Sequence, residues 1–355
     1  MVQRTGTLEG VVTEPEFWQG RRVFVTGATG LVGSWLCAWL IDAGARVVGL
    51  VRDADPQSPL FSSGDHLRMS IVSGDLADLG TVERAIVEHE TETVFHLGAQ
   101  AIVAVGEALP IETFESNIRG TYNLLEACRR HSKLVHRVVT ASSDKAYGAQ
   151  ERLPYTEDMP LQGRRPYEVS KSCADLLAQS YFDTYALPVA IARCGNIYGG
   201  GDLNWSRLIP DTIRAAVFGQ PPVLRSNGLY VRDYVYVKDV VGAYTLLAQS
   251  LDDETLHGHA FNFSPERPYS VLEVVKAIQE QMPATAQPPV ILDVAQGEIE
   301  SQYLDSSKAR RLLSWSARYS FAEGLAETIE WYRDFLSRTD APHRPREVDR
   351  RHHVC

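Results

Sequence analysis

Cysteine is scarce in this sequence, and long apolar runs are absent from it. The five cysteines among 355 residues are scattered without a CxxC pair. This usage argues against a disulfide framework and favours buried free thiols in a reducing cytoplasm. No stretch approaches the roughly 20 apolar residues of a membrane span, and the first apolar run, at 23–26, does not resemble a signal peptide. We therefore expect a cytoplasmic protein with no membrane partner.

Basic residues are outnumbered as well. The chain has 35 Lys and Arg against 45 Asp and Glu, which gives a net charge of −10. Nucleic acid is not an expected partner, because binding its phosphates calls for a basic surface. A small phosphate-bearing molecule stays compatible, since one pocket can be positive on an acidic protein. No metal site is expected, because the late residues His343, His352, His353 and Cys355 lack a regular ligand spacing.

Short apolar runs alternate with helical patterns over the first 195 residues. Buried strands are predicted at 22–26, 46–51, 71–74, 93–97, 137–142 and 188–193. Helices are predicted between them, notably at 34–43, 78–89, 114–131 and 166–185. This alternation indicates an α/β protein with a Rossmann-type, doubly wound parallel sheet that helices cover on both faces.

After residue 195 the alternation becomes less regular. Further elements are predicted as helices at 208–218 and 271–281 and as a strand leading into a helix over 234–247. We expect a dinucleotide-binding domain over 1–195 and a smaller α/β substrate lobe over 196–337 that threads back onto the main sheet. The remaining expectations are an irregular arm over 1–20 and a disordered tail over 338–355.

A glycine-rich loop joins the first predicted strand to the first helix. Its residues are Gly27, Ala28, Thr29, Gly30, Leu31, Val32 and Gly33. Gly27 permits a tight turn, Gly30 lets the backbone approach a pyrophosphate, and Gly33 lets the helix pack on the sheet. The helix start would offer free N–H groups to the phosphates. At the end of the second strand, Arg52 could meet the 2′-phosphate of NADP and Asp53 the ribose of NAD, or both could be solvated.

Two further groups of residues carry chemistry. Tyr167 and Lys171 are four positions apart on a predicted helix, so they share one face. An ammonium near a phenol lowers the pKa of the phenol, so Tyr167 could take a hydroxyl proton while hydride leaves. Ser143, Asp144 and Lys145 follow the fifth strand, at the sheet edge where such folds place their sites. The alternative is that Asp144 and Lys145 form a solvated turn.

At these residues the chain resembles the extended short-chain dehydrogenase/reductase family, in particular its nucleotide-sugar 4,6-dehydratases. Segments similar to CDP-glucose 4,6-dehydratases lie at 17–20, 33–36, 143–145, 195–202, 207–210 and 304–309. The stretch 231–239 is more similar to epimerases and other dehydratases. Leu50-Val51-Arg52 is similar to GDP-mannose dehydratases, which use NADP.

The resemblance implies a role for each matching residue. Tyr167 would be the redox base, Lys171 its tuner and a ribose ligand, and Ser143 the partner of the C4 oxygen. Asp144 and Lys145 would be the acid/base pair that eliminates water. The cofactor would be bound by the glycine loop and by Asp75, Leu76, Leu97, Ala99 and Gln100. It would be NAD, with NADP as the alternative because of Arg52. The nucleoside diphosphate would be bound by Asn196, Arg207, Leu208 and Arg232, and Asn117 would be structural.

The sequence therefore predicts an NAD(P)-dependent lyase acting on a nucleoside-diphosphate sugar, with CDP-glucose as the expected substrate. One alternative is a 4-epimerase, which forms the same ketone and reduces it on its other face. Another is a non-catalytic dinucleotide-sensing protein. The resemblance also implies a homodimer through the helices that hold Asn117 and Tyr167. The apolar residues expected at that interface are Leu124, Leu125, Leu176, Leu177 and Tyr181.

Overall fold

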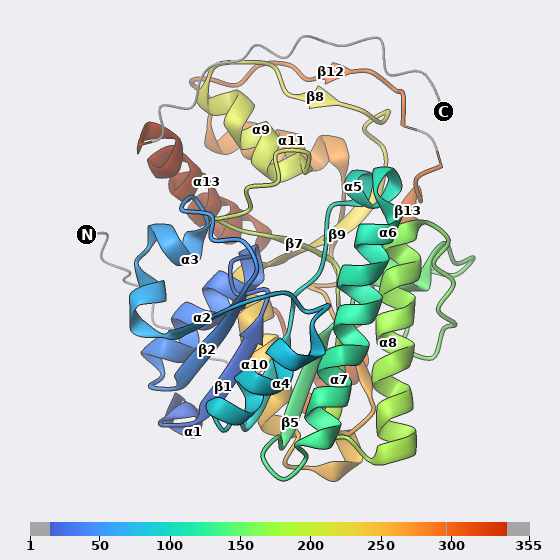
Figure 1. Ribbon diagram of the computed structural model, residues 1–355. Coiled ribbons are helices and arrows are strands. Elements are labelled where there is room, and N and C mark those ends of the chain that lie inside the picture. The colour runs from blue at the N-terminus through green and yellow to red at the C-terminus, as the bar shows by residue number, and fades with distance from the viewer. Residues whose placement is uncertain (1–14, 296, 339–355) are drawn as a thin grey trace.

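The structure is a computed structural model that describes residues 15–295 and 297–338 (Figure 1). The tail predicted to be disordered, with its histidines and Cys355, lies outside the described residues from residue 339 on. Most of the predicted irregular arm lies outside them too. For the end of this arm, the prediction of irregular structure is wrong. Residues Pro15–Trp18 form the short helix α1, and Trp18 is fully buried against Phe95 and Trp39.

A seven-stranded parallel sheet forms the centre of the described part of the chain. Its strands, in chain order, are β1 (Arg22–Thr26), β2 (Arg46–Val51), β3 (Ser70–Ser73), β4 (Thr93–His96), β5 (Arg137–Ala141), β6 (Val189–Cys194) and β10 (Ala260–Phe263). The spatial order is β10-β6-β5-β4-β1-β2-β3. The strand order reverses between β1 and β4, which is the point where ligands bind in open α/β sheets. The predicted Rossmann-type fold is confirmed.

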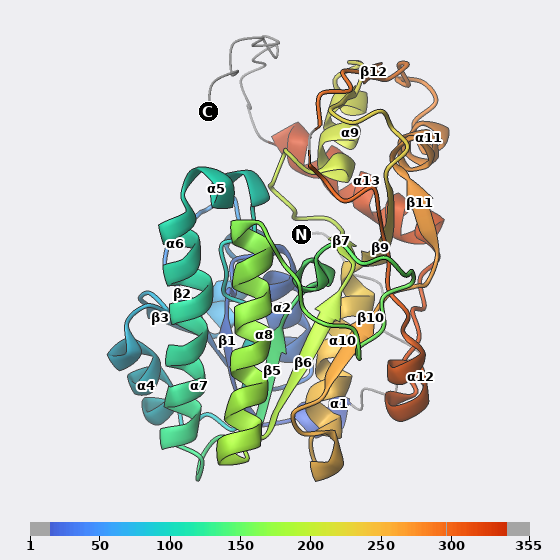
Figure 2. The same cartoon turned by 90° about the vertical axis from the view of Figure 1, so that its right-hand side faces the viewer.

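Helices cover both faces of this sheet (Figure 2). One face carries α2 (Leu31–Asp42) and α10 (Val237–Ser250), and the other carries α4 (Leu79–Glu88), α7 (Gly120–Arg130) and α8 (Pro166–Tyr185). Alternate strand residues such as Val23 and Phe24 enter the two different cores. Burial on both faces explains why the strands are near-continuous apolar runs.

The second part of the chain forms a smaller lobe above the carboxyl ends of the strands (Figure 1). Its strands are β7 (Asn196–Tyr198), β8 (Val223–Leu224), β9 (Val231–Tyr236), β11 (Pro268–Ser270), β12 (Val290–Ile291) and β13 (Ser301–Gln302). Its helices are α9 (Leu208–Val217), α11 (Val271–Gln281) and α13 (Phe321–Arg338). The helix α12 (Ser307–Leu313) lies outside this lobe and packs against α10 and β10 of the main sheet (Figure 2). β9 is central, because β7, β11 and β13 all pair with it. Since α10 and β10 return to the main sheet, the boundary at residue 195 stays a prediction.

Short elements connect these units. They are α3 (Pro59–Ser62), η1 (Asp65–Arg68), α5 (Val103–Ala108), α6 (Pro110–Phe114), η2 (Glu115–Arg119), η3 (Asp144–Tyr147) and η4 (Glu254–Leu256). The helix predicted over 114–131 is interrupted, because η2 is a π-helical turn ahead of α7. Within the described ranges, no helix combines the length and the apolar character needed to cross a membrane.

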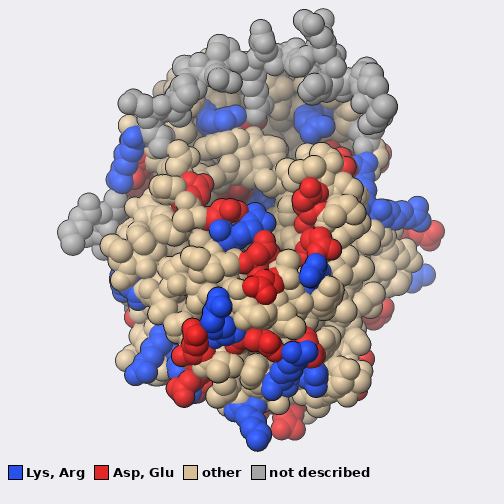
Figure 3. All heavy atoms as spheres, in the orientation of Figure 1, with Lys and Arg blue, Asp and Glu red and all other residues tan. Residues whose placement is uncertain are grey.

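The surface shows two features that bear on partners. On the face drawn in Figure 3, acidic and basic side chains are interspersed, and no extended basic patch is visible. The apolar residues expected at a dimer interface differ in their exposure to solvent. Leu124 and Leu125 are wrong candidates, because both are fully buried against the sheet, whereas Leu176 on α8 is 55% exposed.

Candidate active site

The glycine loop has the geometry that a dinucleotide requires. Gly27 has a φ of +70°, and a Cβ there would lie 2.7 Å from the nitrogen of Gly98. A Cβ on Gly33 would lie 2.0 Å from the carbonyl oxygen of Gly27, so α2 packs directly on the loop. Gly30 is the N-cap of α2 and caps it with no side chain. The first N–H groups of the helix therefore face the loop without a side-chain acceptor, and the residues fit a bound pyrophosphate.

A buried polar chain supports the segment predicted to line the cofactor. The Thr26 hydroxyl accepts from the N–H groups of Gly98 (3.0 Å) and Leu97 (3.2 Å) and lies 2.9 Å from Nδ1 of His96. Nε2 of His96 lies 2.9 Å from the Thr121 hydroxyl, which donates to the Asn117 carbonyl. Since the Thr121 proton is used there, Nε2 of His96 donates and Nδ1 accepts. Burial lowers the pKa of His96 to about 3, so the ring is neutral. Sequence reasoning missed this histidine.

Asn117 holds the next part of the same segment. Its side chain exchanges two hydrogen bonds with the backbone of Gln100, at 2.7 and 3.0 Å, and donates to the Ser170 hydroxyl at 2.9 Å. It lies in the π-helical turn η2, and such turns are frequent at functional sites. The asparagine thus connects the loop around Ala99 to α8, one turn from Tyr167.

The remaining predicted cofactor residues lie at the carboxyl ends of β2 and β3. Leu76 is buried, and a Cβ on Gly98 would meet its Cδ1 at 2.5 Å. Asp75 accepts from the Ala77 N–H at 2.8 Å. Arg52 and Asp53 follow β2 directly and form an exposed ion pair with each other at 2.7 Å.

Tyr167 and Lys171 lie on the first turns of α8, as predicted. Nζ of Lys171 donates to the carbonyl of Ala141 at the end of β5 (2.8 Å), and burial lowers its pKa to about 8. Desolvation raises the pKa of Tyr167 to about 12, against the lowering effects of the Arg207 charge and a hydrogen bond with Ser143. The lower phenol pKa expected from Lys171 is therefore wrong for this structure, because desolvation outweighs the favourable contacts.

Ser143, Asp144 and Lys145 form a compact group at the end of β5. The Ser143 hydroxyl caps η3 by accepting from the Lys145 N–H (3.2 Å) and donates to Oδ1 of Asp144 (2.9 Å). Asp144 is 2% exposed, and its Oδ2 has no hydrogen-bond partner but lies 3.9 Å from Nζ of Lys145. Burial lowers the pKa of Lys145, although Asp144 raises it. A solvated turn is excluded by this burial.

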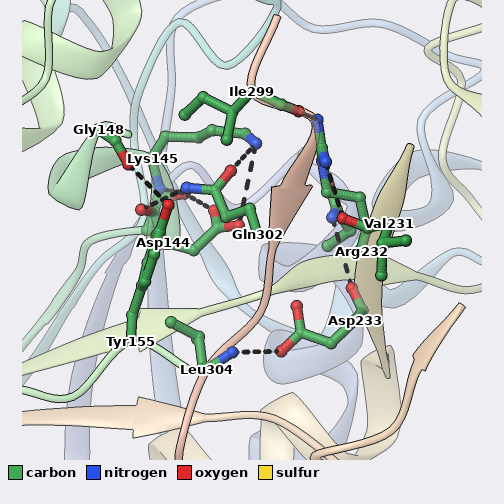
Figure 4. Close-up of polar contacts among 12 residues, drawn as sticks. Asp144, Lys145, Gly148, Tyr155, Val231, Arg232, Asp233, Ile299, Gln302 and Leu304 are labelled. Carbon is green, nitrogen blue, oxygen red and sulfur yellow. Dashed lines mark hydrogen bonds and ion pairs between the residues drawn. The ribbon is translucent and has the colours of Figure 1, made fainter. Parts of the chain in front are cut away.

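Two residues from distant strands complete the group, and sequence reasoning missed both (Figure 4). Gln302 on β13 is fully buried and bonds to Lys145 and to the backbone of Asp144. Asp233 on β9 is also fully buried, and its Oδ2 accepts from the Leu304 N–H at 3.2 Å. Burial, reinforced by the charge of Asp144, raises the pKa of Asp233 to about 7.

The predicted substrate residues lie around the same space. Arg207 is the residue before α9, which begins at Leu208. Its guanidinium forms an ion pair with Asp202 at 3.0 Å, and its charge lowers the pKa of Tyr167. Asn196 donates to the Asp233 carbonyl at 3.4 Å. Arg232 donates to the carbonyls of residues 231, 299 and 300. The structure thus brings two arginines to this group: the charge of Arg207 acts on Tyr167, and the charge of Arg232 acts on Lys145.

In the described part of the chain, no cluster of His, Cys, Asp and Glu is arranged to hold a metal ion. The side chains gathered beside the glycine loop are a phenol, two ammonium groups and buried carboxyl groups. Such an arrangement suits proton transfer next to a dinucleotide.

Comparison with known proteins gives a consistent result. The family model described as GDP-mannose 4,6 dehydratase matches residues 24–328. A CDP-glucose 4,6-dehydratase of Salmonella typhimurium is 33% identical over 345 residues, which cover 92% of this chain and 94% of that protein.

Two solved structures are similar over most of the chain. One is a dTDP-glucose 4,6-dehydratase from Bacillus anthracis in complex with NAD, with a TM-score of 0.78 and 25% identity, covering 89% of this chain and 97% of that one. The other is a UDP-glucose 4-epimerase from Thermotoga maritima with UDP-glucose, with a TM-score of 0.80 and 27% identity, covering 88% and 99%.

Proposed function

This chain belongs to the GDP-mannose 4,6 dehydratase family, within the extended short-chain dehydrogenases/reductases, and we propose that it is a nucleoside-diphosphate-sugar 4,6-dehydratase, a lyase. The observation that carries the proposal is the buried Asp144 beside Lys145, at the end of β5 and next to Tyr167. A redox step alone needs only the tyrosine and its lysine. A buried acid/base pair is what the loss of water adds.

The proposed cofactor is NAD. The glycine loop and the uncapped start of α2 fit its pyrophosphate, and the Bacillus anthracis relative was solved with NAD. Held by the glycine loop, NAD would supply the hydride acceptor for C4 of the sugar and the hydride donor for C6. The pairing of Arg52 with Asp53 lessens the case for NADP, since a 2′-phosphate would have to compete with that carboxylate.

The residues of this chain account for the proton transfers. Tyr167 takes the C4 hydroxyl proton, and the Ser143 hydrogen bond and the Arg207 charge favour the phenolate. The C4 ketone acidifies the C5 hydrogen. Within the Asp144/Lys145 pair, one group removes the C5 proton and the other protonates the departing C6 hydroxyl, so one water leaves. A proton then returns to C5, which balances the cycle and leaves a 4-keto-6-deoxy sugar.

The proposed substrate is CDP-glucose, supported by the Salmonella typhimurium relative. Arg207, Arg232 and Asn196 would bind the diphosphate side of the molecule. The alternative, a 4-epimerase, predicts a product of unchanged mass. We expect the enzyme to act in the cytoplasm, which the free thiols of the described cysteines support.

We also propose a homodimer formed through α7 and α8. The support is Leu176, exposed on α8, and Tyr122, 40% exposed on α7. Leu124 and Leu125 take no part, because they are in the core.

One experiment tests the function. The purified protein is incubated with CDP-, dTDP-, UDP- and GDP-linked sugars, and the products are weighed by mass spectrometry. We expect one substrate to lose a water, and the cofactor released from the same sample to have the mass of NAD. A product with the mass of its substrate would favour the epimerase, and no conversion of any sugar would contradict the proposal.

A further inference from the structure

Gln302 is a fully buried polar residue that sequence motifs gave no reason to consider. It lies on β13, which comes late in the chain and pairs in parallel with β9 at Ser301–Val231 and Gln302–Arg232. Its side chain points away from its own strand towards the loop that follows β5, as Figure 4 shows. The contact joins residues 157 positions apart in sequence.

Both ends of the Gln302 amide are engaged. Oε1 accepts from Nζ of Lys145, and Nε2 donates to the carbonyl oxygen of Asp144 at 2.9 Å. The orientation of the amide is thereby fixed. If it were reversed, the NH₂ group would face the ammonium and the oxygen would face the carbonyl, so that two repulsive contacts would replace two hydrogen bonds.

The placement of Lys145 depends on this amide. A lysine side chain is long and flexible, and it loses considerable conformational freedom when it is held in one position. Oδ2 of Asp144 lies 3.9 Å from Nζ, beyond hydrogen-bond distance, so Asp144 attracts the ammonium but does not orient it. Gln302 supplies an oriented acceptor, and by holding the Asp144 backbone it sets the spacing within the pair.

The same strand leads to the substrate side of the site. The guanidinium of Arg232 donates to the carbonyls of Ile299 and Glu300, immediately before β13. The backbone from 299 to 302 therefore connects the arginine proposed to bind the diphosphate with the ammonium of Lys145. A shift of this strand would move both groups together.

We propose that Gln302 is a positioning residue that holds the Lys145 ammonium in register with Asp144 for the elimination of water. The inference rests on the proposed dehydratase function. The side-chain hydrogen bonds of Gln302 go to Lys145 and to the Asp144 backbone and not to Tyr167, so oxidation at C4 should not depend on it. The two halves of the reaction can therefore be separated.

The charges around Lys145 give a second, independent test. Burial and Arg232 lower the pKa of Lys145, whereas Asp144, Glu168 and Asp233 raise it. Gln302→Leu removes a neutral acceptor from the ammonium, so the pKa of Lys145 should fall. Gln302→Glu keeps the acceptor and adds a negative charge, so the pKa should rise. A role limited to stabilising the fold would produce no such opposite pair of shifts.

The experiment uses the full chain with its substrate and with its cofactor bound. Rapid quenching followed by mass spectrometry separates the 4-keto sugar that keeps its C6 hydroxyl from the dehydrated product. We expect Gln302→Leu to accumulate that 4-keto sugar and to eliminate water about 10- to 100-fold more slowly, the effect of losing a hydrogen bond to a charged group. C4 oxidation should keep the wild-type rate. The matched control is Gln279→Leu on α11, which removes only a hydrogen bond to the Gln287 carbonyl and should match the wild type.

The second readout is made on protein without substrate. NMR titration of ¹³C-labelled lysine, with Lys145→Met to assign the signal, gives the pKa of Lys145 in each variant. Opposite shifts in the Leu and Glu variants, together with the stalled elimination, would support the inference. Equal slowing of both half-reactions with an unshifted pKa, or unchanged elimination, would overturn it. Failure of the wild type to dehydrate any sugar would instead contradict the proposed function, and the titration would still test the Gln302–Lys145 contact.

Discussion

Replacing Gly33 with alanine should damage the cofactor loop more than its size suggests. The added Cβ would lie 2.0 Å from the carbonyl oxygen of Gly27 and 2.8 Å from its carbon, whereas ordinary contact begins at 3.4 Å. Helix and loop would have to separate by more than 1 Å. The loop has little room to retreat, because not even a Cβ fits between Gly27 and Gly98: one built on Gly27 would lie 2.7 Å from the Gly98 nitrogen. The helix cannot shift freely, because Leu36 and Leu40 are fully buried.

The expected cost is at the upper end for overpacking, about 3 kcal/mol of unfolding free energy. Gly30→Ala is the matched control, because its Cβ would meet only the Gly27 oxygen at 3.3 Å and its φ of −72° suits alanine. We expect Gly30→Ala to unfold close to the wild-type urea midpoint without cofactor but to bind NAD more weakly in calorimetry. Gly33→Ala should both unfold at a lower urea concentration and bind NAD more weakly. Equal stability of Gly33→Ala and the wild type would refute this account of the loop.

Four further outcomes are expected. Tyr167→Phe should lower the dehydration rate by about 10²- to 10⁴-fold and leave the thermal midpoint of the cofactor-free protein unchanged. Asp144→Asn combined with Lys145→Ala should retain C4 oxidation but slow dehydration by a similar factor; dehydration at the wild-type rate would remove the pair from the mechanism. The pKa of Asp233 is raised to about 7 in the folded state, so this group makes stability fall as pH rises from its ordinary 3.8. Between pH 3.8 and about 7, the unfolding free energy of Asp233→Asn in urea titrations should therefore rise relative to that of the wild type, by up to about 1.4 kcal/mol per pH unit. Unfolding free energies that change with pH in parallel in the two proteins would exclude a raised pKa. Leu176→Arg should convert the dimer to a monomer in light scattering, and a wild-type monomer would exclude the proposed interface.

The sequence predicted the main sheet well where burial on both faces shapes the composition. The bounds of β1, β2, α8 and α11 match the predicted ranges. The strand β10 was missed because its second half contains Asn262, which is fully buried and accepts a hydrogen bond from Tyr147 at 2.7 Å. A polar residue satisfied inside the core interrupts the apolar pattern on which strand prediction depends.

The helix predicted over 114–131 shows a second limit. Side-chain periodicity does not reveal a π-helical turn, which changes the backbone hydrogen bonds and only slightly changes the apolar pattern. The turn at 115–119 is where Asn117 contacts Gln100 and Ser170. The asparagine was identified by resemblance, and its contacts required the structure.

Within the site, prediction succeeded for residues that are neighbours in sequence. Tyr167 and Lys171 share a helix face, and Ser143, Asp144 and Lys145 share one short turn. Gln302 and Asp233 come from β13 and β9, and only the parallel pairing of those strands brings them to β5. Burial was equally invisible to spacing, which is why the pKa of Tyr167 was expected to be low and is raised to about 12.

The central claim is that oxidation at C4 is transient and serves the loss of water. The most direct measurement uses the converted nucleoside-diphosphate sugar labelled with deuterium at C4, with NMR and mass analysis of the product. The account predicts that the product lacks one water and carries the deuterium at C6. Deuterium that stays at C4 in a product of unchanged mass would contradict it, and so would deuterium lost to solvent.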